Sequence, residues 1–180
     1  MFDNIKAIFL DRDGTIGGCD RVFYPGEFEL FPNVAESIKH LQKSGKLVFS
    51  FTNQPGISKG EATLEDFEKE LFEFGFNKVY ICPHQHNEGC ECRKPSKGML
   101  IKADEENNLK LEQCVVIGDR WTDMVAADEA GCIKILVKTG SGTEAYNKYI
   151  NNEFFGHWGN VKPDYIAQNI NNAIKWLMAI

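Results

Sequence analysis

The stretch IKAIFLDRDGT, residues 5–15, decides how the chain folds. Its first six residues are almost all apolar, which indicates a short buried strand. The apolar run stops at Asp11, and a second carboxylate, Asp13, follows two residues later. In open parallel sheets, ligands bind beyond the carboxyl ends of the strands. The stretch therefore predicts a buried strand with a functional site directly after it.

Further apolar runs alternate with amphipathic stretches along the rest of the chain. Strands that alternate with helices indicate a parallel sheet covered on both faces. We find no internal repeat and no interdomain linker, so we expect one α/β domain over residues 1–180, a Rossmann-like three-layer fold with a mainly parallel central sheet. The expected strands are 5–10, 47–51, 78–81, 114–117 and 133–137, the expected helices are 34–41, 64–74, 99–107, 122–130 and 166–177, and 141–163 is left unassigned.

The composition narrows the class of partner. The chain has 180 residues, a formal net charge of −6 and 43% hydrophobic residues. An acidic balance argues against a nucleic-acid or membrane-surface partner, because both need a basic face, but a small anionic substrate responds only to the local site. The start of the chain has no apolar signal core, and no uncharged run approaches the ~20 residues that a membrane span needs. We expect a cytoplasmic protein that is a monomer, with an oligomer left open.

Carboxylates follow two of the predicted strands. Asp11 comes after the first strand and Asp119 after the strand at 114–117. Neighbouring strands would bring these hard oxygen ligands together, and such ligands suit Mg²⁺. A carboxylate on the cation can also attack a phosphate ester and form an aspartyl-phosphate. Asp13 could protonate the leaving oxygen and then activate water. The pattern predicts phosphomonoester hydrolysis with Asp11 and Asp13 as catalytic residues.

Hydrogen-bonding and cationic side chains follow two other predicted strands. Thr52 and Asn53 begin the turn after the second strand, and Arg93 with Lys94 lies in the loop after the third. A hydroxyl and the amides of a turn can bind phosphoryl oxygens, and the two cations can neutralise their charge. Each segment alone would be an ordinary loop start. Together, at one edge of one sheet, they predict that all four residues bind the substrate.

Three of the six cysteines crowd into one short loop, residues 82–92, together with two histidines. Three thiolates and one imidazole suit a tetrahedral structural zinc ion. Four protein ligands leave no open position, so we expect a structural site that clamps the loop leading into Arg93 and Lys94. His86 is the spare histidine and is expected in solvent. The predicted zinc ligands are Cys82, His84, Cys90 and Cys92.

The order of these residues is similar to that of a known family. Asp11-Arg12-Asp13-Gly14-Thr15 resembles the DxDGT signature of haloacid-dehalogenase-type (HAD) phosphatases, and Thr52, Lys94 and Asp119 follow in the order of the later motifs. The resemblance implies that Asp11 is the nucleophile and Asp13 the general acid and base. It also implies Mg²⁺ held by the Asp11 carboxylate, the Asp13 backbone carbonyl and Asp119, with Asp123 in the outer coordination sphere. Asp123 could instead be only a carboxylate at a helix N-terminus.

The cysteine loop resembles a narrower group. Cys82-Pro83-His84 and residues 89–95, GCECRKP, resemble the zinc-bearing branch of these phosphatases, which includes heptose bisphosphate and histidinol-phosphate phosphatases. That branch has little or no cap domain, and the short gap from Thr15 to Val34 agrees with this. The resemblance implies a small phosphorylated metabolite as substrate: D-glycero-D-manno-heptose 1,7-bisphosphate first, histidinol phosphate or another sugar phosphate second. Residues 17–29 match neither enzyme well, and we expect substrate selection there.

A phospho-receiver signalling domain is the alternative from another class. It also carries an acceptor aspartate, acidic strand ends and a lysine on a doubly wound sheet. It needs neither Asp13 nor a zinc loop, and the chain has no phosphate-loop or dinucleotide motif. The sequence therefore favours a Mg²⁺-dependent phosphatase with a structural zinc.

Overall fold

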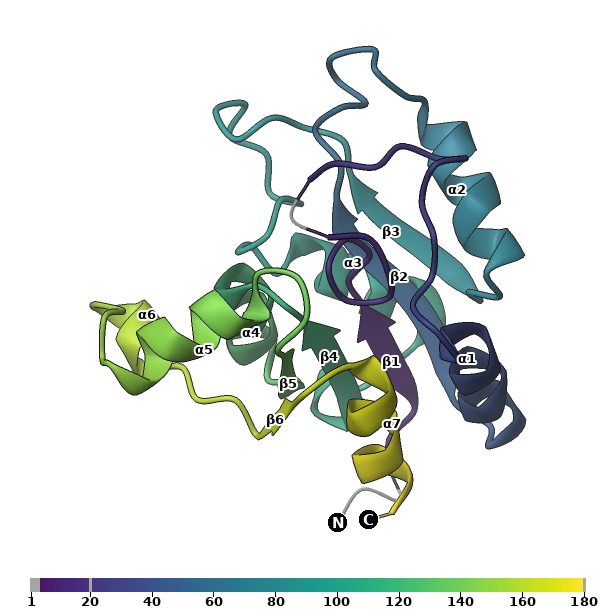
Figure 1. Ribbon diagram of the computed structural model, residues 1–180. Coiled ribbons are helices and arrows are strands. Elements are labelled where there is room, and N and C mark those ends of the chain that lie inside the picture. Colours follow the sequence, from purple (N-terminus) through teal and green to yellow (C-terminus); the bar gives the residue numbers. More distant parts are fainter. Residues whose placement is uncertain (1–3, 20, 180) are drawn as a thin grey trace.

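A six-stranded sheet forms the centre of the molecule (Figure 1). The computed structural model describes residues 4–19 and 21–179. All of the strand pairs are parallel, so the prediction of a single α/β domain is confirmed and the sheet is wholly rather than mainly parallel. In spatial order the strands are β3 (Lys78–Cys82), β2 (Leu47–Asn53), β1 (Ala7–Leu10), β4 (Cys114–Gly118), β5 (Ile133–Val137) and β6 (Tyr165–Ala167).

The apolar run that opens the chain is β1, near the middle of the sheet. Its four side chains are fully buried and alternate between the two faces. Ile8 and Leu10 pack with the helices α1 (Val34–Lys43) and α7 (Ile170–Met178), whereas Ala7 and Phe9 pack with α3 (Gly98–Asn107) and α4 (Trp121–Ala130). A strand covered on both faces is apolar throughout, which is why this run shows no polar alternation.

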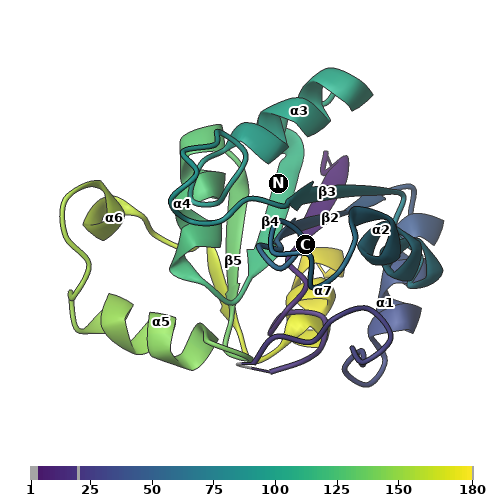
Figure 2. The same ribbon diagram turned by 90° about the horizontal axis from the view of Figure 1, so that it is seen from above.

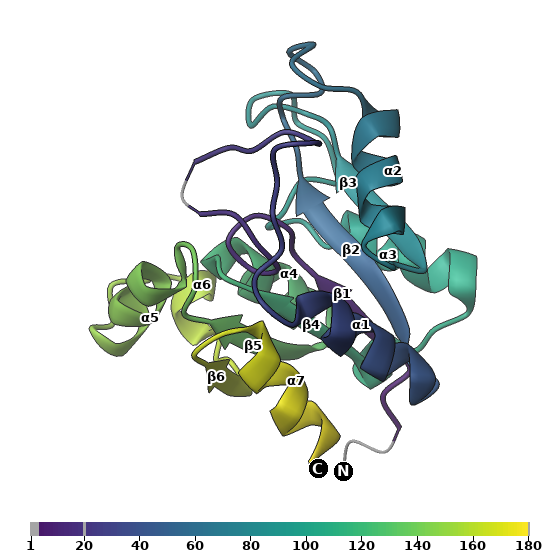
Figure 3. The same ribbon diagram turned by 45° about the vertical axis from the view of Figure 1, so that its right-hand side comes forward.

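Helices cover both faces of the sheet. Figure 3 shows α1 and α7 in front of the strands and α3 and α4 behind them. Thr63 accepts a hydrogen bond from the backbone N–H of Asp66 and so caps α2, as its position before a helical pattern predicts. The helices are α1 (Val34–Lys43), α2 (Leu64–Glu73), α3 (Gly98–Asn107), α4 (Trp121–Ala130), α5 (Gly142–Ile150), α6 (His157–Asn160) and α7 (Ile170–Met178), with a 3₁₀ turn at Leu111–Gln113.

The expected helix over 166–177 is wrong at its start. Tyr165–Ala167 pairs with β5 as the edge strand β6, and Ile166 lies opposite Leu136. The helix then begins at Ile170, where the Asn169 side chain accepts a hydrogen bond from the backbone N–H of Asn172 (3.0 Å). Three apolar residues show no period of their own, so only pairing with a neighbouring strand decides their structure. Three other strands end slightly later than expected: β2 includes Thr52 and Asn53, β3 includes Cys82, and β4 includes Gly118.

The segment that could not be assigned, 141–163, forms an arm at one side of the domain. It contains α5 and the short α6, which project sideways beyond β5 and α4 (Figures 1 and 2). Between β1 and α1 the described residues, 11–19 and 21–33, make only a loop, pinned by isolated bridges from Gly17 to Asp13 and Leu30, and they include no cap domain. Within the described residues, no helix combines the length and apolarity needed to cross a bilayer.

Candidate active site

Three carboxylates meet at the carboxyl edge of the sheet. β1 and β4 are neighbours, with Leu10 opposite Ile117, and the N–H of Asp11 continues their ladder by donating to the Ile117 carbonyl (3.1 Å). Asp119 follows β4 directly, and Asp123 lies in the first turn of α4. All three aspartates are buried, and one carboxylate oxygen from each lies within 4.8 Å of the others. The juxtaposition of Asp11 and Asp119 predicted from the sequence is therefore present.

Lys94 is the cation of this cluster. Its Nζ lies 2.9 Å from Asp11 Oδ1 and 2.6 Å from Asp123 Oδ1, and it donates to the Phe51 carbonyl (3.0 Å). Burial alone would lower the pKa of Lys94, but the two carboxylates outweigh burial and raise it. The other oxygen of Asp123 accepts the N–H of Arg120 (3.0 Å). Asp123 therefore caps α4 and also contacts Lys94, while its place in the outer coordination sphere of a metal ion stays a prediction.

Asp119 lies in a close-fitting slot. Its oxygens accept hydrogen bonds from the Thr15 hydroxyl (3.2 Å) and from the N–H of Ser141 (2.8 Å). Gly14 and Gly140 cover it from two loops: a Cβ on either would lie 2.3 Å from Asp119 Oδ2, and both have positive φ. Only glycine fits at such positions without moving the carboxylate. The DxDGT glycine thus makes room for Asp119.

The charge balance of the cluster fits a bound cation. Burial, with the nearby Asp11 and Asp123 carboxylates, raises the pKa of Asp119 to about 8. Burial likewise raises the pKa of Asp123 to about 6, although Lys94 opposes the shift. Three buried carboxylates share one lysine, which leaves an excess of negative charge in a low-dielectric site. Oxygen ligands of this kind suit Mg²⁺, so the residues present fit the predicted ion.

Asp13 faces the cavity beside this cluster. Its two oxygens contact Arg12 Nη1 (2.7 Å) and Gln54 Nε2 (2.6 Å), and Gln54 also donates to the Thr52 hydroxyl (3.0 Å). Burial raises the pKa of Asp13, and Asp11 adds to this, while Arg12 and Gln54 oppose it. A carboxyl group with a raised pKa that is held by two donors can both give and take a proton.

Arg12 is fully buried, although sequence reasoning gave it no role. Besides Asp13, its guanidinium contacts Glu70 of α2 through Nε (2.9 Å) and Nη2 (2.8 Å), and it donates to the Phe23 carbonyl (2.9 Å). The ring of Phe28 lies against it, 3.8 Å from centroid to Cζ. Arg12 therefore connects Asp13 to α2 and to the loop before α1.

The predicted substrate-binding residues lie around the same opening. Asp11, Asp13, Thr52, Asn53, Arg93 and Lys94 all line one cavity of about 480 Å³. Asn53 bonds both backbone groups of Lys94, since Oδ1 accepts the N–H (3.1 Å) and Nδ2 donates to the carbonyl (3.3 Å). Asn53 thus positions the lysine, and its direct contact with substrate stays a prediction. Arg93 donates to the His84 carbonyl (3.0 Å).

The four predicted zinc ligands converge in the loop after β3. The Sγ atom of Cys90 lies 3.6 Å from those of both Cys82 and Cys92, and His84 Nδ1 lies 3.2 Å from the Cys92 sulfur. Sulfur atoms bound at ~2.3 Å around a tetrahedral zinc ion are separated by about 3.8 Å, so the arrangement fits zinc. Burial raises the pKa of Cys90, yet the Arg93 amide and the neighbouring thiols more than offset this and hold it at about 7. Burial raises the pKa of Cys82 and Cys92, so in the absence of a cation only the Cys90 pKa is shifted toward the thiolate, the form that binds metal.

His86 is not part of this cluster and lines the active-site cavity instead.

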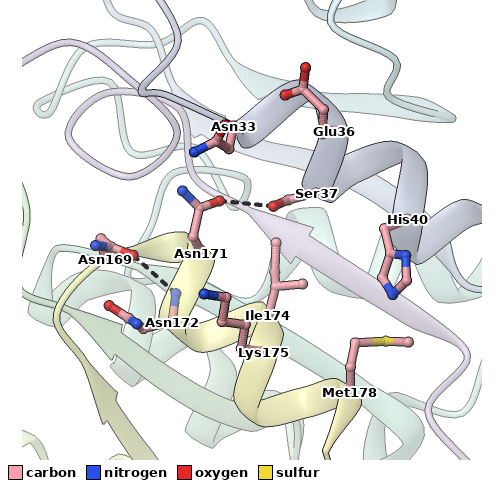
Figure 4. A pocket seen from close by; sticks show the side chains of 10 residues that line it. All are labelled: Asn33, Glu36, Ser37, His40, Asn169, Asn171, Asn172, Ile174, Lys175 and Met178. Carbon is pink, nitrogen blue, oxygen red and sulfur yellow. Dashed lines mark hydrogen bonds between the residues drawn. The ribbon is translucent and has the colours of Figure 1, made fainter.

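A larger groove, of about 660 Å³, lies between α1 and α7 (Figure 4). Polar side chains line it and bond one another: Ser37 donates to Asn171 Oδ1 (2.8 Å), as the dashed line in Figure 4 marks. None of the site residues predicted from the sequence lines this groove. We therefore assign the chemistry to the smaller cavity at the strand ends.

Some residues of the site carry no sequence signal of their own. Gln54 and Ser141 lie in turn-like segments, and the Ser141 contact to Asp119 is made by a backbone N–H that any residue but proline supplies. Trp158 lines the cavity from the arm, which the sequence pattern did not assign. Their roles depend on the tertiary fold.

Comparisons with known proteins agree with this geometry. The family model for haloacid dehalogenase-like hydrolases matches residues 18–131, and a second model, of HAD-hydrolase-like proteins, matches residues 91–173. D-glycero-beta-D-manno-heptose-1,7-bisphosphate 7-phosphatase of Helicobacter pylori strain J99 is 39% identical over 83% of this chain and 92% of its own length. The D-glycero-alpha-D-manno-heptose-1,7-bisphosphate 7-phosphatase of Campylobacter jejuni is 36% identical over 87% of this chain and 92% of its own.

A solved structure supports the same assignment. The D,D-heptose 1,7-bisphosphate phosphatase of B. bronchiseptica, solved with magnesium and phosphate, superposes with a TM-score of 0.81 at 26% identity and covers 97% of this chain and 98% of its own. Likeness of fold and sequence extends over most of the chain. This chain therefore belongs to the haloacid dehalogenase-like hydrolases and, among them, to the D-glycero-D-manno-heptose-1,7-bisphosphate 7-phosphatase family.

Proposed function

We propose that this protein hydrolyses the 7-phosphate of D-glycero-D-manno-heptose 1,7-bisphosphate in a Mg²⁺-dependent reaction. The observation that carries the proposal is the buried cluster of Asp11, Lys94, Asp119 and Asp123, in which Asp11 and Lys94 line a cavity together with Asp13. The names of the relatives support the substrate, and the magnesium and phosphate in the B. bronchiseptica enzyme support the ion. The relatives carry both anomeric names, so the anomer is left to experiment.

Asp11 is the proposed nucleophile. One of its carboxylate oxygens attacks the phosphorus, the bond from phosphorus to the sugar oxygen breaks, and an aspartyl-phosphate forms. Lys94, 2.9 Å from Asp11, offsets the negative charge that carboxylate and phosphoryl group bring together. When bound, Mg²⁺ would neutralise further charge on the phosphoryl oxygens; Asp11, Asp119 and the Asp13 backbone carbonyl would hold it, with Asp123 in the outer sphere.

Asp13 is the proposed general acid and base. It gives its proton to the departing sugar oxygen and then, as a carboxylate, takes a proton from the water that cleaves the aspartyl-phosphate. Its raised pKa suits the first step, and its contacts to Arg12 and Gln54 keep the carboxyl group in place for the second. Thr52 and Arg93 supply further donors toward phosphate oxygens at the rim of the cavity.

The zinc loop has a positioning role in this proposal. A zinc ion held by the four ligands would fix the loop that leads directly into Arg93 and Lys94. The bonds from Asn53 to the Lys94 backbone attach the other end of that segment to β2. The segment that carries Arg93 and Lys94 would thus be held both by the zinc site and by β2, which fixes Lys94 beside Asp11.

The test is a kcat/KM comparison over both heptose bisphosphate anomers, histidinol phosphate and other sugar phosphates. One heptose bisphosphate anomer should exceed the other substrates by at least tenfold. Asp11→Asn should lower turnover by several orders of magnitude and keep the fold. Glu105→Gln, on the exposed side of α3, removes a carboxylate away from the site and is the matched control. Near-normal activity of Asp11→Asn would refute the mechanism.

Two other outcomes would replace the proposal. A clear preference for histidinol phosphate would move the substrate to the second candidate. A stable aspartyl-phosphate without turnover would favour the phospho-receiver alternative, which the pairing of Asp13 with Asp11 in one cavity argues against. The monomeric state and cytoplasmic location expected from the sequence stay predictions, and light scattering of the purified protein tests the first.

A further inference from the structure

The arm at 141–163 places one aromatic side chain in the active-site cavity. Trp158, from α6, lines the same cavity as Asp11 and Asp13 and keeps 37% of its surface exposed. It comes from the side of α4, whereas Tyr24 and its neighbours line the cavity from the loop before α1. The cavity is thus bounded by the arm as well as by the loop where the sequence predicts substrate selection.

Stacked aromatic rings hold the arm against the start of α4. Phe154 stacks on Trp121 at the start of α4, with ring centroids 4.3 Å apart and planes at 8°, and Tyr149 stacks at 5.2 Å. The indole N–H of Trp121 donates to the backbone carbonyl of Trp158 (3.1 Å). The four-residue α6 is therefore held through the backbone of Trp158, and the Trp158 ring also lies near Phe154, with ring centroids 6.5 Å apart.

The indole of Trp158 is free to meet a ligand. Among the residues that the structure describes, its N–H has no hydrogen-bond partner. Tyr24, the other aromatic residue of the cavity, is already engaged: its hydroxyl donates to Glu61, and its ring lies against Gly56. A flat apolar face with one unused donor at its edge suits a sugar, which presents C–H groups on one side and hydroxyls at its rim.

We propose that Trp158 is a specificity-determining residue whose indole packs against the sugar of the substrate while the phosphate is held at Asp11. The inference rests on the proposed function and names the residue that recognises the part of the substrate beyond the reacting phosphate. Because Trp158 meets the sugar and not the phosphate, its loss raises KM for a sugar phosphate and leaves the chemistry on the phosphoryl group unchanged. A small substrate without a sugar does not depend on it.

The experiment compares Trp158→Ala and Trp158→Phe with the wild type on heptose bisphosphate and on acetyl phosphate, a reactive phosphoryl donor with no sugar. Phe155→Ala is the matched control, since Phe155 is an aromatic neighbour on the same arm, is 83% exposed and does not line the cavity. For Trp158→Ala we expect a roughly tenfold fall in kcat/KM on heptose bisphosphate, equal to ~1.4 kcal/mol, mostly through KM. The rate on acetyl phosphate stays within about twofold, and Trp158→Phe recovers most of the loss.

A binding measurement separates contact from structure. In the Asp11→Asn background, heptose bisphosphate should change the tryptophan emission, and adding Trp158→Phe should abolish that change although Trp121 and Trp176 remain. If Trp158→Ala does not fold, Trp158→Leu takes its place, because leucine keeps apolar bulk but lacks the flat ring. The same fall in kcat/KM on heptose bisphosphate, and the same unchanged rate on acetyl phosphate, are expected for it.

The possible failures are distinct. An equal loss on both substrates, or no loss on either, would overturn the inference and leave the proposed function standing. Wild-type protein that cleaves acetyl phosphate but neither heptose bisphosphate anomer would overturn the proposed function and the inference with it.

Discussion

Replacing Asp119 by asparagine should make the magnesium-free protein more stable while removing its activity. Burial and the carboxylates of Asp11 and Asp123 raise the pKa of Asp119 from 3.8 to about 8. In the unfolded chain this group ionises near pH 4, so between pH 4 and pH 8 folding requires it to take up a proton. The stability of the wild type therefore falls as pH rises through that window. The variant lacks this cost.

The magnitude follows from the same pKa values. At ~1.4 kcal/mol for each pKa unit, the difference between 3.8 and about 8 sets a ceiling of ~6 kcal/mol at pH 8. Asp11 and Asp123 share the repulsion and respond when one partner is neutralised, so we expect a gain of ~2–3 kcal/mol. The amide can keep both contacts, accepting from the Ser141 N–H and donating to the Thr15 hydroxyl.

Urea unfolding at pH 5, 7 and 8 measures this effect in magnesium-free buffer with zinc retained. The gain of Asp119→Asn over wild type should grow with pH, and millimolar Mg²⁺ should stabilise the wild type but not the variant. Glu105→Gln, exposed on α3, should show the wild-type pH dependence. A variant no more stable than wild type at pH 8, or a gain equal at pH 5 and pH 8, would refute the reasoning.

Two further predictions concern the glycine cover and the zinc loop. Gly14→Ala should lower kcat by at least ~100-fold, because its Cβ would lie 2.3 Å from Asp119 Oδ2. Gly26 also has a positive φ, but a Cβ there would have no atom within 4 Å, so Gly26→Ala tests backbone strain alone. Equal losses of kcat in the two variants would contradict the packing argument. Cys90→Ser should lower the zinc content found by metal analysis below one ion per chain, and should lower both the thermal midpoint and kcat/KM. Cys19→Ser is the control, because Cys19 lies outside the cluster, and this variant should keep its zinc. An unchanged zinc content in Cys90→Ser would exclude Cys90 as a ligand.

Much of the fold could be predicted because its strands are buried on both faces. Runs such as residues 5–10 and 133–137 are apolar except for one lysine each and are bounded by polar turns, so their type and order follow from the sequence. The edge strand β6 could not be predicted, since Ile166 becomes part of a strand only by pairing with Leu136. The arm was equally undetermined, because its helices depend on rings that stack across elements, such as Trp121 on Phe154.

The candidate site could likewise be predicted only in part. The juxtaposition of Asp11 and Asp119 could be predicted because both follow the ends of neighbouring parallel strands, where topology alone brings them together. Asn53 was predicted to bind substrate, but its side chain is used by the Lys94 backbone, a contact that local sequence does not reveal. Residue type and spacing indicate which groups can react; the tertiary fold decides which groups hold them.

The buried guanidinium of Arg12 has a consequence for engineering this enzyme. It bonds Asp13, the side chain of Glu70 and the carbonyl of Phe23, and it stacks on Phe28. The loop before α1 and the helix α2 are therefore one module in which neither part can be exchanged alone. A chimera that takes this loop from a relative with another substrate should also take α2 from that relative; otherwise a buried cation loses its carboxylate partner and Asp13 loses the contact that orients it.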